Sequence, residues 1–315
     1  MNAVAASALT RRFGDLTAVD SLSFEVAPGE IFGLVGPDGA GKTTTMRLLT
    51  SIMTPTSGDA WIHGNHVTSD ADAVKNIIGY MSQRFGLYSD LTVMENIDFY
   101  ADIYGVPRAG RSAAIDRLLA FSNLSPFTNR LAGNLSGGMK QKLGLACALV
   151  HTPKVLFLDE PTNGVDPVSR RDFWRILYQL LREGVTIFLS TAYLDEAERC
   201  SRIGLLHHGS LIALGAPQEV KTLMRGAIVE VAAPELRSAA AALRAVFPPR
   251  AVSLFGDRIH VAVDQASTGI PAVSDVLKKA ALTVTTVREV PPSLEDIFVS
   301  VLSETPGATA DASSK

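Results

Sequence analysis

The segment G-P-D-G-A-G-K-T at positions 36–43 constrains the fold more than any other part of this sequence. It follows a short apolar run at 31–35 and precedes a helix-like segment at 43–51, so we expect it to join a buried strand to a helix. Glycines at such a turn let backbone N–H groups surround phosphate oxygens, and the helix N-terminus adds a partial positive charge. The chain is therefore expected to contain an α/β domain that binds the phosphates of a nucleotide.

Two side chains of this loop carry the predicted chemistry. Lys42 can reach the β- and γ-phosphates of a nucleotide, and the Thr43 hydroxyl can ligate Mg²⁺. The alternative is a chance glycine-rich turn with an ordinary surface lysine, and the strand and helix on either side argue against it. The predicted nucleotide-binding positions are Gly36, Asp38, Gly39, Ala40, Gly41, Lys42, Thr43 and Thr44.

A second apolar run, at 155–158, is followed by two carboxylates, Asp159 and Glu160. Asp159 is placed to hold the water shell of Mg²⁺, and Glu160 is placed to polarise an attacking water. The alternative is an acidic pair that only caps the helix after Pro161. The phosphate-binding loop alone does not separate a kinase, a GTPase and a transporter subunit. Because the acidic pair occurs together with this loop, we expect a site that hydrolyses a bound nucleotide with Mg²⁺.

The composition limits what else the chain can do. Hydrophobic residues make up 47% and charged residues 19% of the 315 residues, which is typical of a well-packed globular protein. The net charge of −3 gives no general attraction to nucleic acid, so we expect no nucleic-acid partner. No run of about 18 apolar residues occurs, so a role at a membrane would require docking onto a separate membrane protein.

The sequence divides into regions of different pattern. Positions 1–224 alternate short apolar runs with helix-like segments, which predicts a layered α/β domain. Positions 225–304 predict a small module, and the polar residues 305–315 predict a disordered tail. In the first region the expected strands include 23–26, 77–81, 185–189 and 203–206, and an amphipathic helix is expected at 173–181.

The module at 225–304 has the β-α-β-β-α-β order of a ferredoxin-like unit. It closes with a helix whose start is marked by Ser293 and Asp296, a pairing of the capping-box kind. Its expected strands are 227–231, 252–255, 259–263 and 283–287, and its expected helices are 234–246 and 270–280.

Positions 135–142 read L-S-G-G-M-K-Q-K and resemble the signature sequence of ABC ATPases. Together with the earlier motifs, this makes roughly the first 220 residues similar to that family, which implies a phosphate-loop NTPase core with an ABC helical subdomain. Ser136, Gly137 and Gly138 open a helix and offer a hydroxyl and bare N–H groups to an anion. In the family this helix end binds the γ-phosphate held by a second ATPase subunit, so two subunits enclose two ATP molecules. Without the other motifs, an ordinary serine-capped helix would be the better interpretation.

The resemblance implies further site residues. Phe13 matches the aromatic residue on which adenine stacks, and Gln83 matches the glutamine that senses Mg²⁺ and water. Asp166 is the acidic member of N-G-V-D at 163–166, which matches the loop that crosses the dimer interface. The apolar segment 84–94 resembles the surface that receives the coupling helix of a membrane permease, although a plain surface loop is the alternative.

One position departs from the family pattern. Family members carry a histidine after the strand expected at 185–189, where it contacts the γ-phosphate, but Ala192 occupies that position here. Losing one preorganised donor to a transition state typically lowers the rate by ~10²–10³. Thr191 or Tyr193 could compensate, or catalysis could rest chiefly on Glu160. The alternative function is a nucleotide-gated subunit with little hydrolysis of its own.

The module and the segment P-S-L-E-D-I-F at 292–298 resemble the daunorubicin-resistance branch of bacterial ABC exporters. This implies an ATPase subunit that lies peripherally on the cytoplasmic face of the inner membrane and works with separate multi-helix membrane permease subunits. The accessory module carries no catalytic constellation of its own. A competing class is an ABC protein that acts on ribosomes or DNA, but the ribosome-acting members have two cassettes in one chain and the DNA-acting members insert a long coiled coil.

Overall fold

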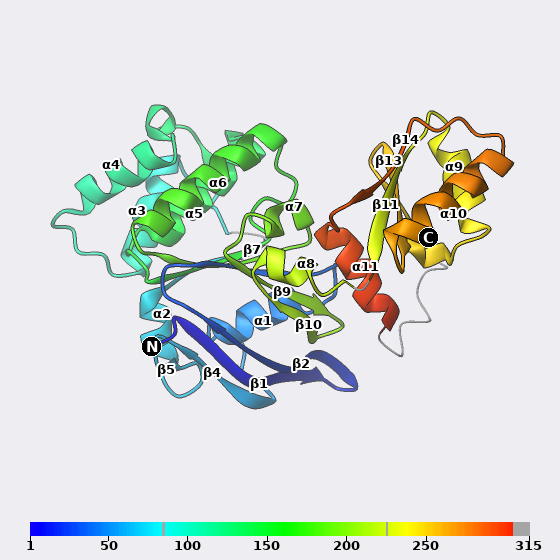
Figure 1. Ribbon diagram of the computed structural model, residues 1–315. Helices are drawn as coiled ribbons and strands as arrows, with labels where there is room; N and C mark the ends of the chain where they lie inside the picture. The colour runs from blue at the N-terminus through cyan, green and yellow to red at the C-terminus, as the bar shows by residue number, and fades with distance from the viewer. Residues whose placement is uncertain (84–85, 225, 305–315) are drawn as a thin grey trace. The chain divides into compact units, whose positions relative to one another are not determined.

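The computed structural model describes residues 1–83, 86–224 and 226–304, and the chain forms two compact units that meet in sequence between Leu214 and Gly215 (Figure 1). The predicted boundary after residue 224 differs from this one, because the short helix α8 (Pro217–Lys221) packs against α11 (Leu294–Glu304). The predicted tail at 305–315 lies outside the described residues. Within the described part of the chain, no helix is both long and apolar enough to cross a bilayer.

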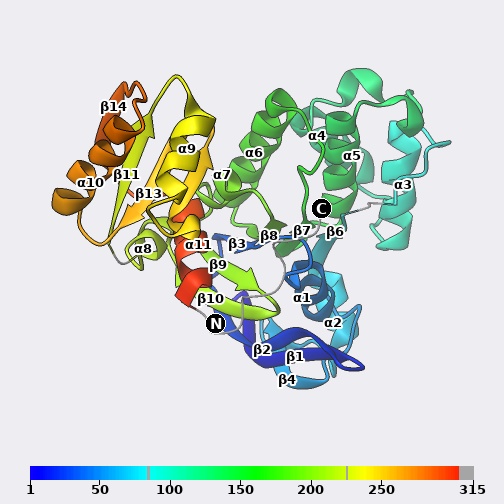
Figure 2. The same cartoon turned by 90° about the vertical axis from the view of Figure 1, so that its right-hand side faces the viewer.

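The N-terminal unit is built on a six-stranded sheet in the order β10-β9-β3-β8-β7-β6 (Figure 2). The strands from β9 to β6 pair in parallel, and β3, β7 and β8 are buried at every residue, as continuous apolar runs predict. The carboxyl ends of parallel strands meet at one edge, where ligands of such sheets bind. The bounds are β3 Ile31–Val35, β6 Ile78–Met81, β7 Val155–Asp159, β8 Thr186–Thr191, β9 Arg202–His207 and β10 Ser210–Gly215.

A second sheet in this unit has the order β2-β1-β4-β5, and its bounds are β1 Val4–Phe13, β2 Leu16–Val26, β4 Ser57–Ile62 and β5 Asn65–His66. The sequence pattern predicted only 23–26, the end of β2. The pairing of β1 with both β2 and β4 contains register shifts, and Ala8 has a positive φ of 48°. Such irregularities interrupt the two-residue alternation of apolar side chains, so the strands lack the usual sequence signal.

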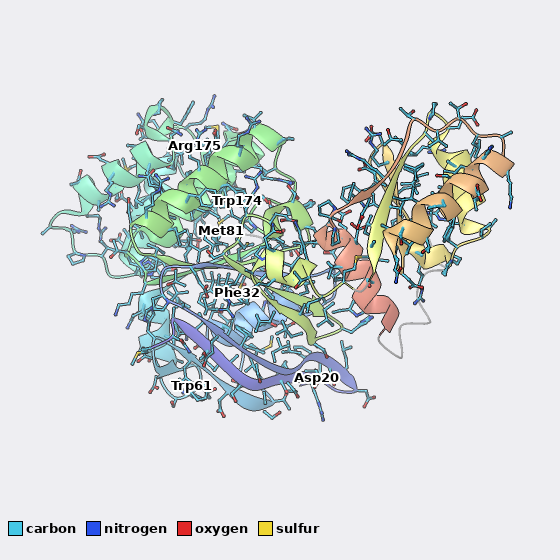
Figure 3. All side chains as sticks on the ribbon, in the orientation of Figure 1. Asp20, Phe32, Trp61, Met81, Trp174 and Arg175 are labelled. Carbon is cyan, nitrogen blue, oxygen red and sulfur yellow. The ribbon has the colours of Figure 1, made fainter. Side chains whose placement is uncertain are left out.

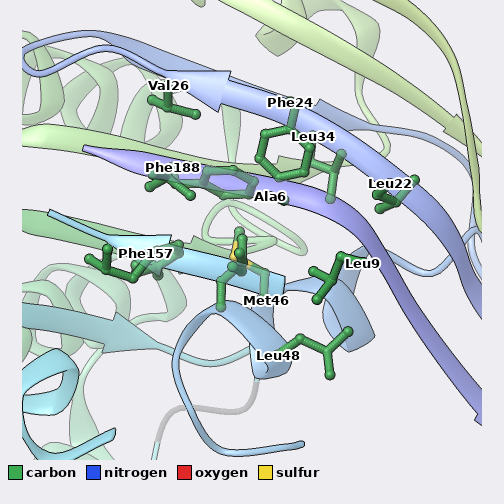
Figure 4. Packing of buried hydrophobic residues seen from close by; sticks show 14 of the residues in the cluster. Ala6, Leu9, Leu22, Phe24, Val26, Leu34, Met46, Leu48, Phe157 and Phe188 are labelled. Carbon is green, nitrogen blue, oxygen red and sulfur yellow. The ribbon is translucent and has the colours of Figure 1, made fainter. Parts of the chain in front are cut away.

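Aromatic packing joins the two sheets in one core (Figure 4). The ring of Phe24 from β2 stacks on Phe32 of β3 at 5.5 Å, and Phe32 lies 5.1 Å from Phe188 of β8. Phe188 in turn lies 5.4 Å from Phe157 of β7. Removing one buried phenylalanine ring typically costs about 3–5 kcal/mol, so this core holds strands β3, β7 and β8 firmly in place.

Three helices of the N-terminal unit form a separate apolar core: α3 (Val93–Ile103), α4 (Arg111–Phe121) and α5 (Gly137–Leu149). Helix α3 begins with a capping box in which Thr92 and Glu95 bond reciprocally. The other helices are α1 (Lys42–Leu49), α2 (Ala71–Ile77), α6 (Pro167–Arg182) and α7 (Leu194–Ala197). Helix α6 is amphipathic, as its sequence predicts: Trp174 is buried, whereas Arg175 is exposed (Figure 3).

The C-terminal unit has the predicted βαββαβ order, and its sheet runs β12-β13-β11-β14 with antiparallel neighbours. Helices α9 and α10 pack against this sheet and against each other. The fourth strand begins later than predicted, because Leu282 and Val284 pack into the core before strand pairing starts. The bounds are β11 Ala227–Ala232, α9 Leu236–Arg244, β12 Val252–Phe255, β13 Arg258–Val263, α10 Ala266–Lys279 and β14 Thr286–Val290.

Candidate nucleotide-binding site

The phosphate-binding loop joins β3 to α1 and depends on glycine at its two ends. A Cβ at Gly36 would lie 2.2 Å from the carbonyl oxygen of Leu206. A Cβ at Gly41 would lie 2.3 Å from the carbonyl oxygen of Ala18, and Gly41 has a φ of 105°. Both positions therefore exclude any side chain, which keeps the loop tight against the sheet and its N–H groups bare.

The side chain of Lys42 is 4% exposed and folds back over its own loop. Its Nζ donates hydrogen bonds to the carbonyl oxygens of Gly36 at 2.8 Å and Pro37 at 3.0 Å. It also forms an ion pair with Glu160, in which Nζ lies 3.0 Å from Oε1. These contacts use the donors of the ammonium group. A phosphate bound in the loop would therefore compete with Glu160 for Lys42.

Asp159 lies at the end of β7, opposite Ser190 of β8. Its Oδ1 accepts hydrogen bonds from the hydroxyls of Ser190 at 2.6 Å and Thr43 at 3.1 Å, whereas its Oδ2 is buried without a partner. Burial and the nearby charge of Asp159 raise the pKa of Tyr80 to about 12. An unpaired carboxylate oxygen beside a hydroxyl is the oxygen donor set that Mg²⁺ prefers. These residues therefore fit a magnesium–nucleotide complex.

Glu160 has a left-handed backbone conformation with a φ of 49°, which is strained for a residue with a side chain. Its N–H donates to the Ser190 hydroxyl at 3.0 Å. Its Oε2 accepts hydrogen bonds from Gln83 Nε2 at 2.8 Å and Asn163 Nδ2 at 3.2 Å. With Lys42 on the other oxygen, the carboxylate is held on both sides, and the strain is consistent with a functional site.

A pocket of about 240 Å³ opens beside Glu160. Its lining includes the position where the sequence departs from the family pattern, and the side chain of Ala192 can donate no hydrogen bond there. The lining residues are Asp38, Glu160, Thr162, Asn163, Thr191, Ala192 and Tyr193.

The predicted signature residues lie at the start of α5. Ser136 caps this helix, because its hydroxyl accepts a hydrogen bond from the N–H of Met139 at 3.3 Å. A Cβ at Gly138 would lie 2.5 Å from the Ser169 side chain in the first turn of α6. The structure thus brings the signature beside the loop at 163–166. The role of Ser136, Gly137 and Gly138 toward a second subunit stays a prediction.

Asp166, predicted to cross a dimer interface, is the N-cap of α6. Its Oδ1 accepts hydrogen bonds from the N–H groups of Ser169 at 2.9 Å and Val168 at 3.1 Å. Hydrogen bonds from Ser169 lower the pKa of the Asp166 carboxyl. A capping role explains this residue within one chain, and its role at an interface stays a prediction.

Two further predictions concern Phe13, expected to stack on adenine, and the segment 84–94, expected to receive a membrane permease. Phe13 ends β1 with 43% of its surface exposed, and the Arg11 guanidinium lies 4.7 Å from its ring centroid. In the segment 84–94, residues 84 and 85 lie outside the described part of the chain. Leu87 and Met94 pack against the core of α3, α4 and α5, so not all apolar side chains of this segment need an external partner.

Sequence reasoning missed Ser190 and Asn163 as site residues. Both contact the predicted carboxylates, Ser190 through Asp159 and Asn163 through Glu160. Ser190 could have been found, because it lies near the end of a strand parallel to the one that carries Asp159. Asn163 is the first residue of the N-G-V-D motif, but its contact with Glu160 was not predictable, since it lies on a loop whose conformation the sequence pattern does not fix.

Comparisons with known proteins agree with this geometry. Residues 19–163 match the family described as "ABC transporter", and residues 215–302 match "ATP-binding protein DrrA1-3-like, C-terminal domain". The chain is 42% identical over 298 residues to the "Probable multidrug ABC transporter ATP-binding protein YbhF" of Escherichia coli K12. That match covers 93% of this chain and 51% of YbhF, so the chain spans about half the length of that relative.

Other relatives match over most of their length. The "Nod factor export ATP-binding protein I" of Burkholderia thailandensis is 38% identical over 293 residues, which is 92% of this chain and 93% of that protein. A structure titled "Structure of ATP binding subunit of ABC transporter" aligns with a TM-score of 0.64 at 28% identity, over 70% of this chain and 92% of that one. The cbiO1 structure from Clostridium perfringens aligns with a TM-score of 0.65 at 25% identity, over 70% of this chain and 91% of that one.

The fold and the site define an ATP-binding cassette of the ABC transporter class. The chain belongs to the ABC transporter ATP-binding protein family, in the branch whose members carry a DrrA1-3-like C-terminal domain. The predicted resemblance to the ABC ATPases and to their daunorubicin-resistance branch is confirmed.

Proposed function

We propose that this chain hydrolyses ATP as the energy-coupling subunit of an ABC exporter. The observation that carries the proposal is the convergence of Lys42, Thr43, Asp159 and Glu160 at one sheet edge, with Asp159 Oδ2 buried and unpaired. A buried carboxylate oxygen without a partner is costly unless a ligand completes it. Mg²⁺ bound with a nucleotide would provide a partner for this oxygen of Asp159.

Each residue then has a task that its contacts support. Lys42 and the loop N–H groups would bind the phosphates, and Thr43, Asp159 and Gln83 are the predicted holders of Mg²⁺, which neutralises developing phosphate charge. Glu160 would orient the attacking water and accept its proton. The ion pair between Lys42 and Glu160 must open for this to happen, because phosphate takes the place of the carboxylate.

The wider assembly is part of the same proposal. Two such subunits would enclose two ATP–Mg complexes, with Ser136, Gly137 and Gly138 of each subunit facing the nucleotide of the other. A separate membrane permease would dock near 84–94, which puts the chain peripherally on the cytoplasmic face of the inner membrane. The names of the relatives, a multidrug transporter protein and a Nod factor export protein, support export rather than a role in nucleic-acid processing.

The test is Mg²⁺-dependent ATP hydrolysis by the full chain, purified with its membrane partner, compared with Glu160→Gln. We expect the substitution to lower kcat by about 10²-fold or more, because a positioned base is lost, while ATP still binds. Trapping of an ATP-bound dimer by Glu160→Gln, measured by size-exclusion chromatography, would support the sandwich. No Mg²⁺-dependent turnover, or turnover unaffected by Glu160→Gln, would contradict hydrolysis.

A second candidate is a nucleotide-gated subunit that binds ATP and dimerises with little turnover. It is favoured by one observation, the alanine at position 192 in the wall of the pocket beside Glu160. The same assay separates the two candidates. Tight ATP binding with ATP-dependent dimerisation, but without Glu160-dependent phosphate release, would support the second.

A further inference from the structure

The wall of the pocket beside Glu160 offers two hydroxyls next to Ala192, and only one of them is free to act toward the site. Thr191 is 1% exposed, and its hydroxyl donates to Glu196 Oε2 at 2.8 Å. The same hydroxyl oxygen accepts the N–H of Tyr193 at 3.0 Å. Since a hydroxyl has a single proton, Thr191 has none left for the pocket.

The hydroxyl of Tyr193 instead reaches the loop that holds Glu160. It donates to Asn163 Oδ1 at 3.4 Å, and Asn163 Nδ2 donates to Glu160 Oε2 at 3.2 Å. A carboxylate can only accept, so the amide must turn its NH₂ group toward Glu160 and its oxygen toward Tyr193. A donor on that oxygen therefore favours the amide orientation that Glu160 needs.

The ring of Tyr193 is itself held in place. The Arg170 guanidinium lies 4.5 Å from the ring centroid, within the range of a cation–π contact. Arg170 forms ion pairs at 3.6 Å with Asp195 and with Glu196. Glu196 is 1% exposed and also accepts hydrogen bonds from the Thr162 and Thr191 hydroxyls. A buried and fully bonded carboxylate thus fixes the arginine that supports the tyrosine.

We propose that Tyr193 is a positioning residue that acts through Asn163 to hold the Glu160 carboxylate in its working orientation. The inference rests on the proposed ATP hydrolysis and names a group that offsets the missing side chain at position 192. Tyr193 does not need to touch the nucleotide. Its contribution is to restrict Asn163, and through it Glu160, so that less reorganisation is required when water attacks the γ-phosphate.

The test compares two tyrosine-to-phenylalanine variants of the full chain. Tyr178 is a matched control, because it is 37% exposed against 38% for Tyr193. Its hydroxyl also makes one hydrogen bond, at 3.3 Å, but to the carbonyl oxygen of Arg199. We measure kcat and KM for ATP at saturating Mg²⁺, with Glu160→Gln assayed in parallel and thermal unfolding as the check on folding.

We expect Tyr193→Phe to lower kcat by about 3- to 10-fold, the range of one neutral hydrogen bond, with KM changed by less than about twofold. Tyr178→Phe should change neither constant. In an Asn163→Ala background, Tyr193→Phe should have no further effect, because its route to Glu160 is gone.

Four other results would contradict the positioning role of Tyr193, and one of them would also contradict the proposed ATP hydrolysis. If Tyr193→Phe behaves like Tyr178→Phe, or lowers kcat equally in the Asn163→Ala background, the positioning role is wrong while ATP hydrolysis stands. If the wild-type chain shows no turnover that depends on Glu160, the proposed function fails and the positioning role fails with it. A shift confined to KM would also overturn the positioning role, because it would assign Tyr193 to nucleotide binding.

Discussion

Each unit of the molecule buries an aspartate, and the two aspartates are treated differently by their surroundings. Asp159 of the N-terminal unit is 1% exposed and leaves Oδ2 without a partner. Asp296 of the C-terminal unit is 8% exposed, and both of its oxygens accept hydrogen bonds. Asp159 therefore keeps one oxygen available to a ligand, whereas the chain itself supplies partners for both oxygens of Asp296.

The surroundings of Asp296 form a closed network. His260 Nδ1 lies 3.0 Å from Asp296 Oδ1, and its Nε2 lies 3.8 Å from Glu230. Glu230 is also paired with Arg288 at 2.8 Å. Ser293 donates to Asp296 Oδ2 through both its N–H and its hydroxyl, which starts α11. This cluster joins α11 to the sheet, and its charged groups are paired with one another.

The comparison shows how to separate a ligand site from a structural cluster when both contain buried charges. Burial alone does not distinguish them. What distinguishes them is the number of hydrogen-bonding positions that remain unfilled, together with strained backbone such as the φ of 49° at Glu160. Three substitutions can break or sharpen this distinction, and they follow in order of expected effect.

The largest effect is expected from Asp159→Asn. Loss of the charge proposed to hold Mg²⁺ should lower Mg²⁺-dependent hydrolysis by about 10²-fold or more. The nucleotide-free chain should be at least as resistant to heat as the wild type, because an unpaired buried charge has been removed. The measurements are a Mg²⁺ titration of ATP hydrolysis and thermal unfolding without nucleotide.

Asp116→Asn is the control for this charge change, because Asp116 is exposed on α4. It should alter neither activity nor melting temperature. A clear loss of thermal stability in nucleotide-free Asp159→Asn would mean that Asp159 is mainly structural, and the contrast with Asp296 would disappear.

The second effect is expected from Asp296→Ala. Removing one partner of a buried ion pair leaves His260 beside an unfilled site, which typically costs about 3–5 kcal/mol. Urea unfolding should show this loss in the transition of the C-terminal unit, while the affinity of the folded chain for ATP stays unchanged. Asp264→Ala, at an exposed position of the same unit, should change stability by less than about 0.5 kcal/mol. Equal losses of unfolding free energy in Asp296→Ala and Asp264→Ala would show that the buried cluster does not stabilise the unit more than an exposed aspartate does.

The smallest effect expected is a dependence of the unfolding free energy on pH, caused by His260. The hydrogen bond to Asp296 raises the pKa of His260 above its ordinary value of 6.5, against the opposing effect of burial, and Glu230 adds to the rise. The resulting stabilisation is fully present below pH 6.5 and is lost as the pH rises through the raised pKa of the folded state. The unfolding free energy of wild type relative to His260→Gln should therefore fall over that window. A difference that stays constant with pH, or grows, would rule out a charged histidine in this cluster.

Parts of the fold were predictable because their signals are local. The run at 31–35 predicted β3 to the residue, since a continuous apolar stretch between turn residues is typical of a buried parallel strand. Strand β1 gave no such signal, because its register shifts interrupt the alternation. Strand β14 begins at Thr286, although a strand was predicted from residue 283. Leu282 and Val284 are apolar and pack against the core, but they lie in the connection that precedes the strand. Apolar character predicts burial, whereas pairing depends on a neighbouring strand.

In the candidate site, too, the residues of local motifs were predictable from the sequence, whereas contacts between distant loops were not. Lys42, Thr43, Asp159 and Glu160 were chosen from their motifs, and the structure brings them together at one sheet edge. Ala192 was expected beside this site and lines the pocket next to Glu160. The contacts of Asn163 and Tyr193 were not predictable, because they depend on how two loops fold against each other.

The sequence alone determined which charged and hydroxyl groups the chain has and the order of strands and helices that carry them, because motifs and periodicity act over short distances along the chain. Only the tertiary structure decided which of these groups meet. Thr43 and Asp159 are 116 residues apart in sequence, yet their side chains lie 3.1 Å apart. The parallel register of β3, β8 and β7 determines that proximity. Tertiary packing within each unit also decided that one oxygen of Asp159 has no partner in the chain, whereas both oxygens of Asp296 accept hydrogen bonds.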